Sequence, residues 1–359
     1  MLHFDTDYMR GAHPEVMRRL AETNLMQTPG YGGDEFTARA QEKILAACGL
    51  TEGKTLFLAG GTQTNATILD SIVSREEGIL AVDTSHINVH EAGAVEACGH
   101  KVLTLPSHEG KMDPKDLEAW LAAFCGDATH AHMVAPGAVY ITQPTEGGTL
   151  YTLAELEALS RVCRKAGILL YLDGARLGYG LAAQGSDVTL KDIARLTDAF
   201  YIGGTKVGAL FGEAVVLCNP SLMKNALTLI KRRGALMAKG RLISLQFETL
   251  FTGELYVRLA RHAVEAAMRV KEIFVKAGFA LYMDSPTNQQ FFVLPNEVID
   301  RLQQSVTFEL WGPRGEVSTP VRFVTDWATS EEDISSLAEE LRKACALEKK
   351  KIDGKTRIC

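Results

Sequence analysis

Two stretches of the chain decide the fold: LLYLDGAR at residues 169–176 and FYIGGTK at residues 200–206. Each contains a continuous apolar run, which is typical of a strand buried on both faces of a sheet, and each includes a charged side chain among small residues where that run ends. Asp173 and Lys206 are 33 residues apart, the length of one strand–helix–strand unit. Because the carboxyl ends of parallel strands meet at one edge of a sheet, we expect both side chains at that ligand-binding edge.

Short apolar runs continue on either side of these two stretches. Between about residue 55 and residue 220 they alternate with helical patterns, such as the helix expected at 153–166 that Gly167 ends. Strand–helix alternation of this kind predicts an α/β fold with a mostly parallel sheet. The expected strands are Leu56–Ala59, Ile79–Val82, Val102–Leu105, Val139–Thr142, Ile168–Leu172, Ala199–Ile202 and Ala214–Cys218.

The last third of the chain has a different pattern, which predicts a small α+β domain. A long amphipathic helix is expected over 254–277, a shorter helix is capped by Asn296, and a capping box at Ser330 and Asp333 opens the last helix. The strands expected between these helices are 279–283, 290–294, 306–310 and 321–325. The chain is thus divided into an N-terminal arm (1–35), a large domain (36–249), a small C-terminal domain (250–347) and a charged tail (348–359).

The composition excludes several classes of protein. The chain of 359 residues has 38 Lys and Arg against 44 Asp and Glu, and its net charge of −6 does not suit binding to a nucleic-acid backbone. The longest uncharged stretch, Ala128–Thr145, contains two histidines and two prolines and is no membrane span, and the N-terminus lacks the apolar core of a signal peptide. Seven scattered cysteines without a CxxC pair indicate reduced thiols in a cytoplasmic protein.

Three short motifs suggest other ligands, but each lacks the context that its ligand needs. Residues 178–183 spell a dinucleotide fingerprint, yet they do not directly follow a strand. Residues 354–356 resemble the end of a phosphate-binding loop whose earlier glycine is missing. His86 and His90 are one helical turn apart, but the sequence is not HExxH and no third ligand stands out, so we expect no metal site.

The segment FLAGGTQTN at residues 57–65 ends a strand and opens a helix. Its small residues leave backbone N–H groups and a threonine hydroxyl free to close on an anion at the helix N-terminus. A phosphate cradle, the Asp173 carboxylate and the Lys206 amine on one sheet edge match the needs of pyridoxal 5′-phosphate. The phosphate would bind the turn, Lys206 would form a Schiff base with the aldehyde, and Asp173 would pair with the pyridine nitrogen.

At these residues the sequence resembles the threonine aldolases of the β-eliminating lyase group, within the fold type I pyridoxal phosphate enzymes. The likeness extends from about Asp7 to Leu341. The segments that carry it are GYGGD (30–34), FLAGGTQTN (57–65), HINVHEAGA (86–94), LDGARLG (172–178), GGTKVGALFGEA (203–214) and RFVT (322–325). The resemblance implies a fold type I large domain with a small C-terminal domain.

The resemblance also implies how the cofactor is held. Lys206 would bond to it covalently, Asp173 would hold the pyridine nitrogen, and His86 would stack on the ring face. Gly61 and Thr62 would bind the phosphate.

For the substrate, the resemblance implies that Arg176 and Arg322 flank the carboxylate, with Arg176 also beside the cofactor. The family has a serine near its N-terminus, and Thr6 could replace it as a further carboxylate contact. A family histidine contacts the substrate hydroxyl. His132 lies near that position in a loose alignment, and His130 competes with it.

In the family, basic residues of a neighbouring subunit also reach the phosphate. The best candidates here are Arg232 and Lys239, and Tyr31 should likewise face the neighbour's site. The resemblance therefore implies a homodimer or homotetramer with shared sites.

The implied activity is cleavage of a β-hydroxy-α-amino acid, L-threonine or L-allo-threonine, to glycine and an aldehyde. Another pyridoxal phosphate-dependent reaction remains open, namely β-elimination, racemisation or cleavage of a bulkier phenylserine-type substrate, because the same scaffold supports all of these. A cofactor-binding protein without catalysis is a further alternative. The base that takes the hydroxyl proton also stays open between His86, His132 and a water.

Overall fold

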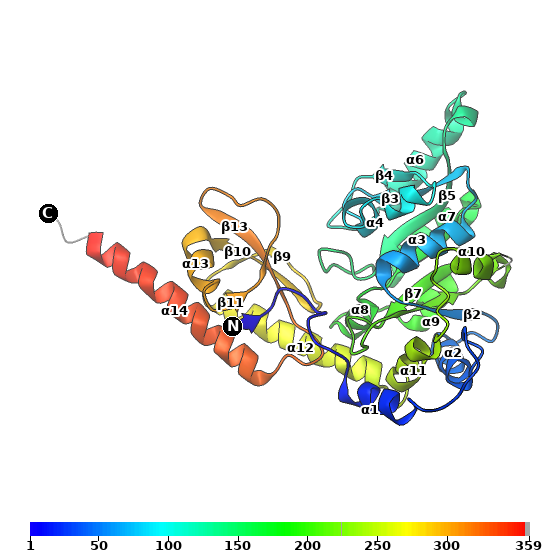
Figure 1. Cartoon of the computed structure of the whole chain (residues 1–359). Helices are drawn as coiled ribbons and strands as arrows, with labels where there is room; N and C mark the ends of the chain where they lie inside the picture. Colours follow the sequence, from blue (N-terminus) through cyan, green and yellow to red (C-terminus); the bar gives the residue numbers. More distant parts are fainter. Residues whose placement is uncertain (224, 356–359) are drawn as a thin grey trace.

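The computed structural model describes residues 1–223 and 225–355. Its centre is a seven-stranded sheet in the order β2-β8-β7-β6-β5-β3-β4 (Figure 1). The strands from β7 to β4 run parallel, and β8 runs antiparallel to both of its neighbours, so the mostly parallel sheet expected from the sequence is confirmed. The strands are β2 (Lys54–Leu58), β3 (Glu77–Val82), β4 (Val102–Leu105), β5 (Ala135–Thr142), β6 (Leu169–Asp173), β7 (Ala199–Gly203) and β8 (Glu213–Leu217).

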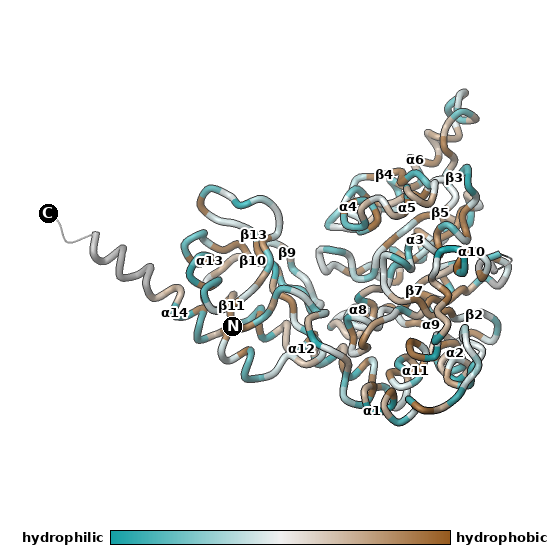
Figure 2. Tube along the Cα trace, viewed as in Figure 1, coloured by the Kyte–Doolittle hydropathy of each residue, from teal (hydrophilic) through white to brown (hydrophobic). Residues whose placement is uncertain are grey.

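Both faces of this sheet are covered. Tyr171 and Tyr201 belong to the apolar core on one side, and their chain neighbours Leu172 and Phe200 belong to the core on the other. This two-sided burial explains the uninterrupted apolar runs, and Figure 2 shows the hydrophobic strands enclosed by helices of mixed character. The surrounding elements are α2 (Glu35–Cys48), α3 (Gly61–Ile72), α4 (His86–Val89), α5 (Ala94–Ala97), α6 (Pro114–Gly126), η1 (His130–His132), α7 (Leu153–Ala166), α8 (Leu177–Ala182), α9 (Leu190–Leu196), η2 (Pro220–Met223), α10 (Ala226–Arg232) and α11 (Arg241–Leu250).

A smaller sheet follows the long helix α12 (Leu255–Lys276), which reaches from the large part of the molecule to the C-terminal part (Figure 1). Its four strands lie in the order β12-β13-β10-β9, over a core in which Phe274, Phe292 and Phe323 pack together. The elements are β9 (Ala280–Met283), β10 (Gln289–Pro295), α13 (Asn296–Leu302), β11 (Val306–Thr307), β12 (Glu309–Leu310), β13 (Ser318–Val324) and α14 (Glu331–Lys355).

Three expectations for this region need correction. The strand expected at 306–310 is two strands, because β11 pairs with the N-terminal β1 (Leu2–His3) while β12 joins the small sheet. Pro295 caps α13, so Asn296 is the first residue of that helix. Helix α14 continues to Lys355 because no proline interrupts it, so most of the expected tail is helical, and residues 356–359 lie outside the described residues. Neither α14 nor another helix of the described residues could serve as a membrane span.

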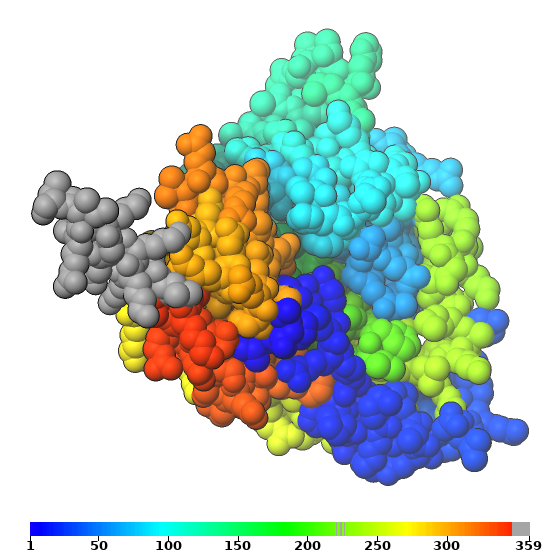
Figure 3. All heavy atoms as spheres, turned by 60° about the vertical axis from the view of Figure 1, so that its left-hand side comes forward, coloured from blue at the N-terminus to red at the C-terminus, as the bar shows by residue number. Residues whose placement is uncertain are grey.

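The N-terminal arm connects the two parts. Strand β1 pairs in parallel with β11, and helix α1 (Pro14–Glu22) packs on α11 of the large part. In Figure 3 these first residues, in dark blue, lie between the small sheet and the rest of the molecule. The polar residues between β1 and α1 are thereby placed where the two parts meet.

Candidate active site

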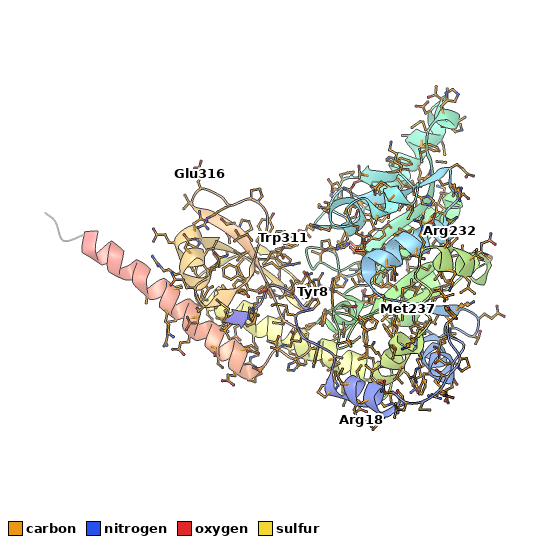
Figure 4. The ribbon with its side chains drawn as sticks, viewed as in Figure 1. Tyr8, Arg18, Arg232, Met237, Trp311 and Glu316 are labelled. Atoms are coloured by element: carbon orange, nitrogen blue, oxygen red, sulfur yellow. The ribbon has the colours of Figure 1, made fainter. Side chains whose placement is uncertain are left out.

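A cavity of about 700 Å³ lies where the arm, the large sheet and the small sheet meet. Figure 4 shows Tyr8 and Trp311 at this junction, with Arg232 and Met237 on the far side of the large part. The cavity brings together four residues expected from the sequence and several that were not. Its lining residues are Tyr8, His86, His90, Glu146, Arg176, Lys206, Tyr282, Glu309, Leu310, Trp311, Gly312, Pro313 and Arg322.

Lys206 lies in the turn after β7, close to the end of β6 that carries Asp173. The Gly203 N–H donates to the Gly174 carbonyl at 2.9 Å, which joins the two strand ends. A Cβ on Gly203 would lie 2.1 Å from the Ala175 carbonyl oxygen, so only glycine permits this approach. The expectation that Asp173 and Lys206 share one sheet edge is therefore confirmed.

A buried carboxylate at the start of β8 fixes the lysine turn. The Gly204 N–H donates to Glu213 Oε2 at 3.0 Å, and the Thr205 hydroxyl donates to Oε1 at 2.8 Å. Burial raises the pKa of Glu213 to about 7, although these donors and the nearby Lys206 act in the opposite direction. Glu213 thus holds the turn that contains Lys206 through its hydrogen bonds, although burial makes its negative charge unfavourable.

The Lys206 amine faces the cavity and is otherwise enclosed by protein, 5.9 Å from the centre of the Tyr8 ring. Burial lowers the pKa of Lys206, and the positive charge of Arg176 lowers it further, while Asp7, Glu146 and Asp173 act in the opposite direction. The lowered pKa increases the uncharged fraction of the amine, which is the form that attacks an aldehyde.

Asp173 is buried at the end of β6 and accepts three hydrogen bonds. Asn65 Nδ2 and the Tyr140 hydroxyl donate to Oδ2 at 2.8 and 2.6 Å, and the Ala175 N–H donates to Oδ1 at 2.9 Å. Burial raises the pKa of Tyr140, and the negative charge of Asp173 raises it further. Tyr140 therefore remains a donor, and the Asp173 carboxylate is held in one orientation.

The same amide group links Asp173 to His86. Asn65 Nδ2 also donates to Glu91 Oε1 at 2.7 Å, and that oxygen lies 2.7 Å from His86 Nδ1. Burial lowers the pKa of His86, but the hydrogen bond to Glu91 and the nearby carboxylates outweigh burial and raise it. The contact between His86 Nδ1 and Glu91 fixes the plane of the imidazole ring.

The N-terminus of α3 lies beside these groups, because Asn65 belongs to its second turn. The first helical hydrogen bond starts from the Thr64 N–H, which leaves the N–H groups of Gly61, Thr62 and Gln63 without partners inside the helix. Free N–H groups at the positive end of a helix bind anions, so this turn has the chemistry expected of a phosphate site.

Arg176 binds Asp7 of the N-terminal arm. Its Nε and Nη2 donate to the two oxygens of Asp7 at 2.8 and 3.0 Å, and both side chains are buried. Asp7 also accepts from Asn288 Nδ2 at 2.9 Å, so it ties the arm to both parts of the molecule. Arg176 still lines the cavity. The neighbouring Thr6 hydroxyl is buried without a hydrogen-bond partner among the described residues, as suits a group that awaits a ligand.

Arg322 on β13 lines the cavity from the small sheet. Its Nη1 donates to Gln289 Oε1 at 2.7 Å, its Nη2 pairs with Glu309, and the guanidinium carbon lies 5.0 Å from the centre of the Trp311 ring. Its buried Nε has no partner among the described residues. Arg322 therefore has a donor free, and it already binds a carboxylate.

The structure corrects the expectation for His132. His130 and His132 form η1, which precedes β5, and both are exposed. The cavity lies at the carboxyl end of β5, where Thr142 pairs with Asp173. With about 3.3 Å per residue, the eight residues of β5 separate this histidine pair from the site. His132 was suggested by a loose alignment with the family, and its place before β5 puts it at the amino end of that strand.

The three residues expected to serve a neighbouring subunit lie outside this cavity. The Tyr31 N–H donates to the Ala238 carbonyl at 3.0 Å, which brings Tyr31 close to Lys239. Arg232 lies 3.5 Å from Asp70, in the second half of α3 and away from the helix N-terminus. None of these residues reaches its own chain's cavity.

Several site residues were missed by the sequence reasoning: Asp7, Asn65, Glu91, Tyr140, Glu146, Glu213 and Glu309. Two of them carried a usable signal. Glu213 interrupts an apolar run where a charge is expensive to bury, and Glu146 follows a strand end at the ligand-binding edge. The others depend on contacts between distant segments.

Comparisons with known proteins show which family and fold this chain is similar to. The β-eliminating lyase family matches residues 3–297. The chain is 28% identical to the low specificity L-threonine aldolase of Pseudomonas aeruginosa over 94% of this chain and 96% of that protein. A solved threonine aldolase from Leishmania major shares 40% identity and a TM-score of 0.92, covering 96% of this chain and 99% of that one. An aspartate aminotransferase of Thermus thermophilus shares only the fold, at 15% identity, a TM-score of 0.69, and 96% and 91% coverage.

Proposed function

The chain belongs to the β-eliminating lyase family, and from that premise we propose that it is a pyridoxal 5′-phosphate-dependent aldehyde-lyase. Its reaction is the cleavage of L-threonine or L-allo-threonine to glycine and acetaldehyde, in keeping with the threonine aldolases to which it is similar. The observation that carries the proposal is the cavity itself. It places a lysine with a lowered pKa and an arginine with an unpartnered donor in the lining of one cavity.

The residues present fit the cofactor. Lys206 offers an amine directed into the cavity, and Asp173 offers a carboxylate whose orientation is fixed by three donors. The free N–H groups at Gly61 and Thr62 suit a phosphate, and His86 presents a ring that Glu91 holds in place. When bound, the cofactor supplies an electron sink for the bond that breaks at the α-carbon of the amino acid.

The chain's own residues bind and orient the amino acid. Arg322 binds the substrate carboxylate in place of Glu309, while the amine is held at the Lys206 end of the cavity. These two fixed points decide which bond of the α-carbon is aligned to break. Thr6 supplies a further donor to the carboxylate from the arm. Tyr8 and Trp311 line the cavity from the arm and from the small sheet (Figure 4).

We also propose a homodimer or homotetramer in which Tyr31, Arg232 and Lys239 serve the neighbour's site. All three residues lie outside the cavity of their own chain, which supports this assignment. The exposure of Tyr31 and of Leu227 also supports it. Mixing a Lys206→Ala protein with a Lys239→Ala protein tests it, because a hybrid with one intact shared site would regain activity. A cytoplasmic location is supported by the seven cysteines, which are scattered along the sequence and include no CxxC pair.

The function is tested by incubating the purified holoenzyme with L-threonine, L-allo-threonine and L-phenylserine. The expected products are glycine together with acetaldehyde or benzaldehyde. Formation of 2-oxobutanoate and ammonia would show β-elimination instead, and formation of D-amino acids would show racemisation. Bound cofactor without any spectral change on addition of an amino acid would show a protein that binds but does not catalyse.

A further inference from the structure

Cleavage between the α- and β-carbons requires a group that takes the proton from the β-hydroxyl of the substrate. The sequence leaves this group open, and the structure removes two candidates. His132 lies at the opposite end of β5 from the cavity. His86 is held through Nδ1 by Glu91, in the fixed orientation that suits a ring stacked on the cofactor.

Two carboxylates line the cavity, and only one of them is free. Glu309 on β12 is paired with Arg322. Glu146 has neither a hydrogen bond nor an ion pair with any described residue, although it acts on the charges of Arg176, Lys206 and Arg322. Glu146 is therefore the carboxylate of the cavity lining whose oxygens are not already taken by another described side chain.

The backbone holds Glu146 at the ligand-binding edge of the sheet. Glu146 is the fourth residue after Thr142, whose partner in the next strand is Asp173. It stands in a tight turn closed by the hydrogen bond from the Gly148 N–H to the Thr145 carbonyl at 2.8 Å. The turn is further tied by the hydroxyls of Thr145 and Thr149, which lie 2.7 Å apart.

Residues at the end of β9 and just after it pack against the same turn. The Ser285 hydroxyl donates to the Gly148 carbonyl at 3.1 Å, and a Cβ on Gly148 would lie 2.3 Å from the Ser285 oxygen. A Cβ on Gly147 would lie 2.4 Å from the sulfur of Met283. Glu146 is therefore placed by both parts of the molecule, the same two parts that supply Lys206 and Arg322.

We propose that Glu146 is the catalytic residue that takes the β-hydroxyl proton. This inference rests on the proposed function. In the step, the O–H bond breaks and the proton bonds to a carboxylate oxygen of Glu146. The O–H electron pair forms the aldehyde C=O bond, the Cα–Cβ bond breaks, and its electron pair is left on the α-carbon, for which a bound pyridoxal phosphate would supply the electron sink. Protonation of that carbon completes glycine, and Glu146 loses its proton to solvent when the aldehyde leaves.

The test compares two reactions of the holoenzyme. One is cleavage of the best β-hydroxy-amino acid substrate, and the other is exchange of the glycine α-proton with D₂O, followed by NMR, which involves no hydroxyl. Glu146→Gln keeps the shape of the side chain and removes its basicity, so cleavage should fall by roughly 10²–10⁴-fold. Glycine exchange should be unchanged. Glu118→Gln, an exposed glutamate on α6, is the matched control and should leave both rates unchanged.

Cleavage by Glu146→Gln at the wild-type rate would overturn the inference, and so would an equal fall in both rates, because that would show general damage to the site. If Glu146→Gln does not bind the cofactor, Glu146→Ala is used with added formate. Formate that restores cleavage supports the inference, and cleavage unaffected by formate overturns it. If the wild-type holoenzyme exchanges glycine protons but cleaves none of the three substrates, the proposed function itself has failed.

Discussion

The two ends of the cavity are built differently. At the large-domain end, Asp173 is 4% exposed and accepts three hydrogen bonds from elements that the sheet holds together. At the small-domain end, Arg322 leaves one buried nitrogen unpartnered and pairs with Glu309, whose side chain is 45% exposed. At the first end, the Asp173 carboxylate already has three hydrogen-bond donors from the protein. At the second end, Arg322 is paired with Glu309, and in the proposed function the carboxylate of the amino acid would take the place of Glu309. In the proposed function, the first end would fix the chemistry and the second would select the amino acid.

The largest effect is expected at the large-domain end. Lys206→Ala removes the amine that we propose holds the cofactor, and it should lower kcat by about 10⁴-fold or more. The visible absorbance of the covalently held cofactor should also be lost. Lys165→Ala, at an exposed lysine, is the control and should change neither. Full turnover with an unchanged spectrum would contradict the role of Lys206.

Asp7 joins the two ends, and its loss tests whether they depend on each other. Asp7→Asn leaves the buried Arg176 without its counter-charge, which should lower the free energy of unfolding by about 3–5 kcal/mol. Denaturant unfolding of the cofactor-free protein measures this change. A loss below about 1 kcal/mol would mean that the pair behaves like an exposed ion pair.

Because Glu213 is buried, the free energy of unfolding should depend on pH. Its folded pKa of about 7 exceeds the ordinary value of 4.5 because of burial, so between these values the folded protein binds a proton that the unfolded chain has lost. Stability from this group therefore falls as the pH rises from about 4.5 to about 7, by about 3 kcal/mol in total. Glu213→Gln should flatten the plot of unfolding free energy against pH in this window. Equal slopes in both proteins would contradict the assignment.

A substitution of Arg322 should weaken binding of the amino acid without affecting attachment of the cofactor. Arg322→Ala removes a charge-assisted hydrogen bond of about 1.5–3 kcal/mol, so glycine affinity should fall roughly tenfold to hundredfold while the cofactor spectrum stays unchanged. Arg314→Ala, on the loop before β13, is the matched control. Glycine binding that is unaffected in Arg322→Ala would exclude Arg322 as the carboxylate anchor.

The smallest effect is expected for Glu309→Gln. This change removes the carboxylate that competes for Arg322, and a half-exposed ion pair contributes at most about 1 kcal/mol. The KM for the amino acid should therefore fall by no more than about fivefold, with kcat unchanged. An increase in KM would show that Glu309 helps to hold the substrate instead of competing with it.

The same contrast explains how far the sequence could predict this molecule. The apolar runs that end near Asp173 and Lys206 predict that both residues lie at one edge of the sheet. This prediction succeeds because the two strands are neighbours that pair with each other, within one strand–helix–strand unit. The partners of Arg322 and the turn of Glu146 depend on packing between distant segments, such as Ser285 against Gly148. His132 was misplaced because it was chosen by a loose alignment with the family, although its position before β5 puts it at the amino end of that strand.

The central claim is that Lys206 holds the cofactor and releases it to an amino acid. Borohydride reduction of the holoenzyme, followed by mass spectrometry of its peptides, tests this directly. Without an amino acid, the phosphopyridoxyl group should be found on the peptide that contains Lys206. With saturating glycine, it should leave the protein and be recovered as phosphopyridoxyl-glycine. A label on another lysine, or a label that stays on the protein when glycine is present, would contradict the account.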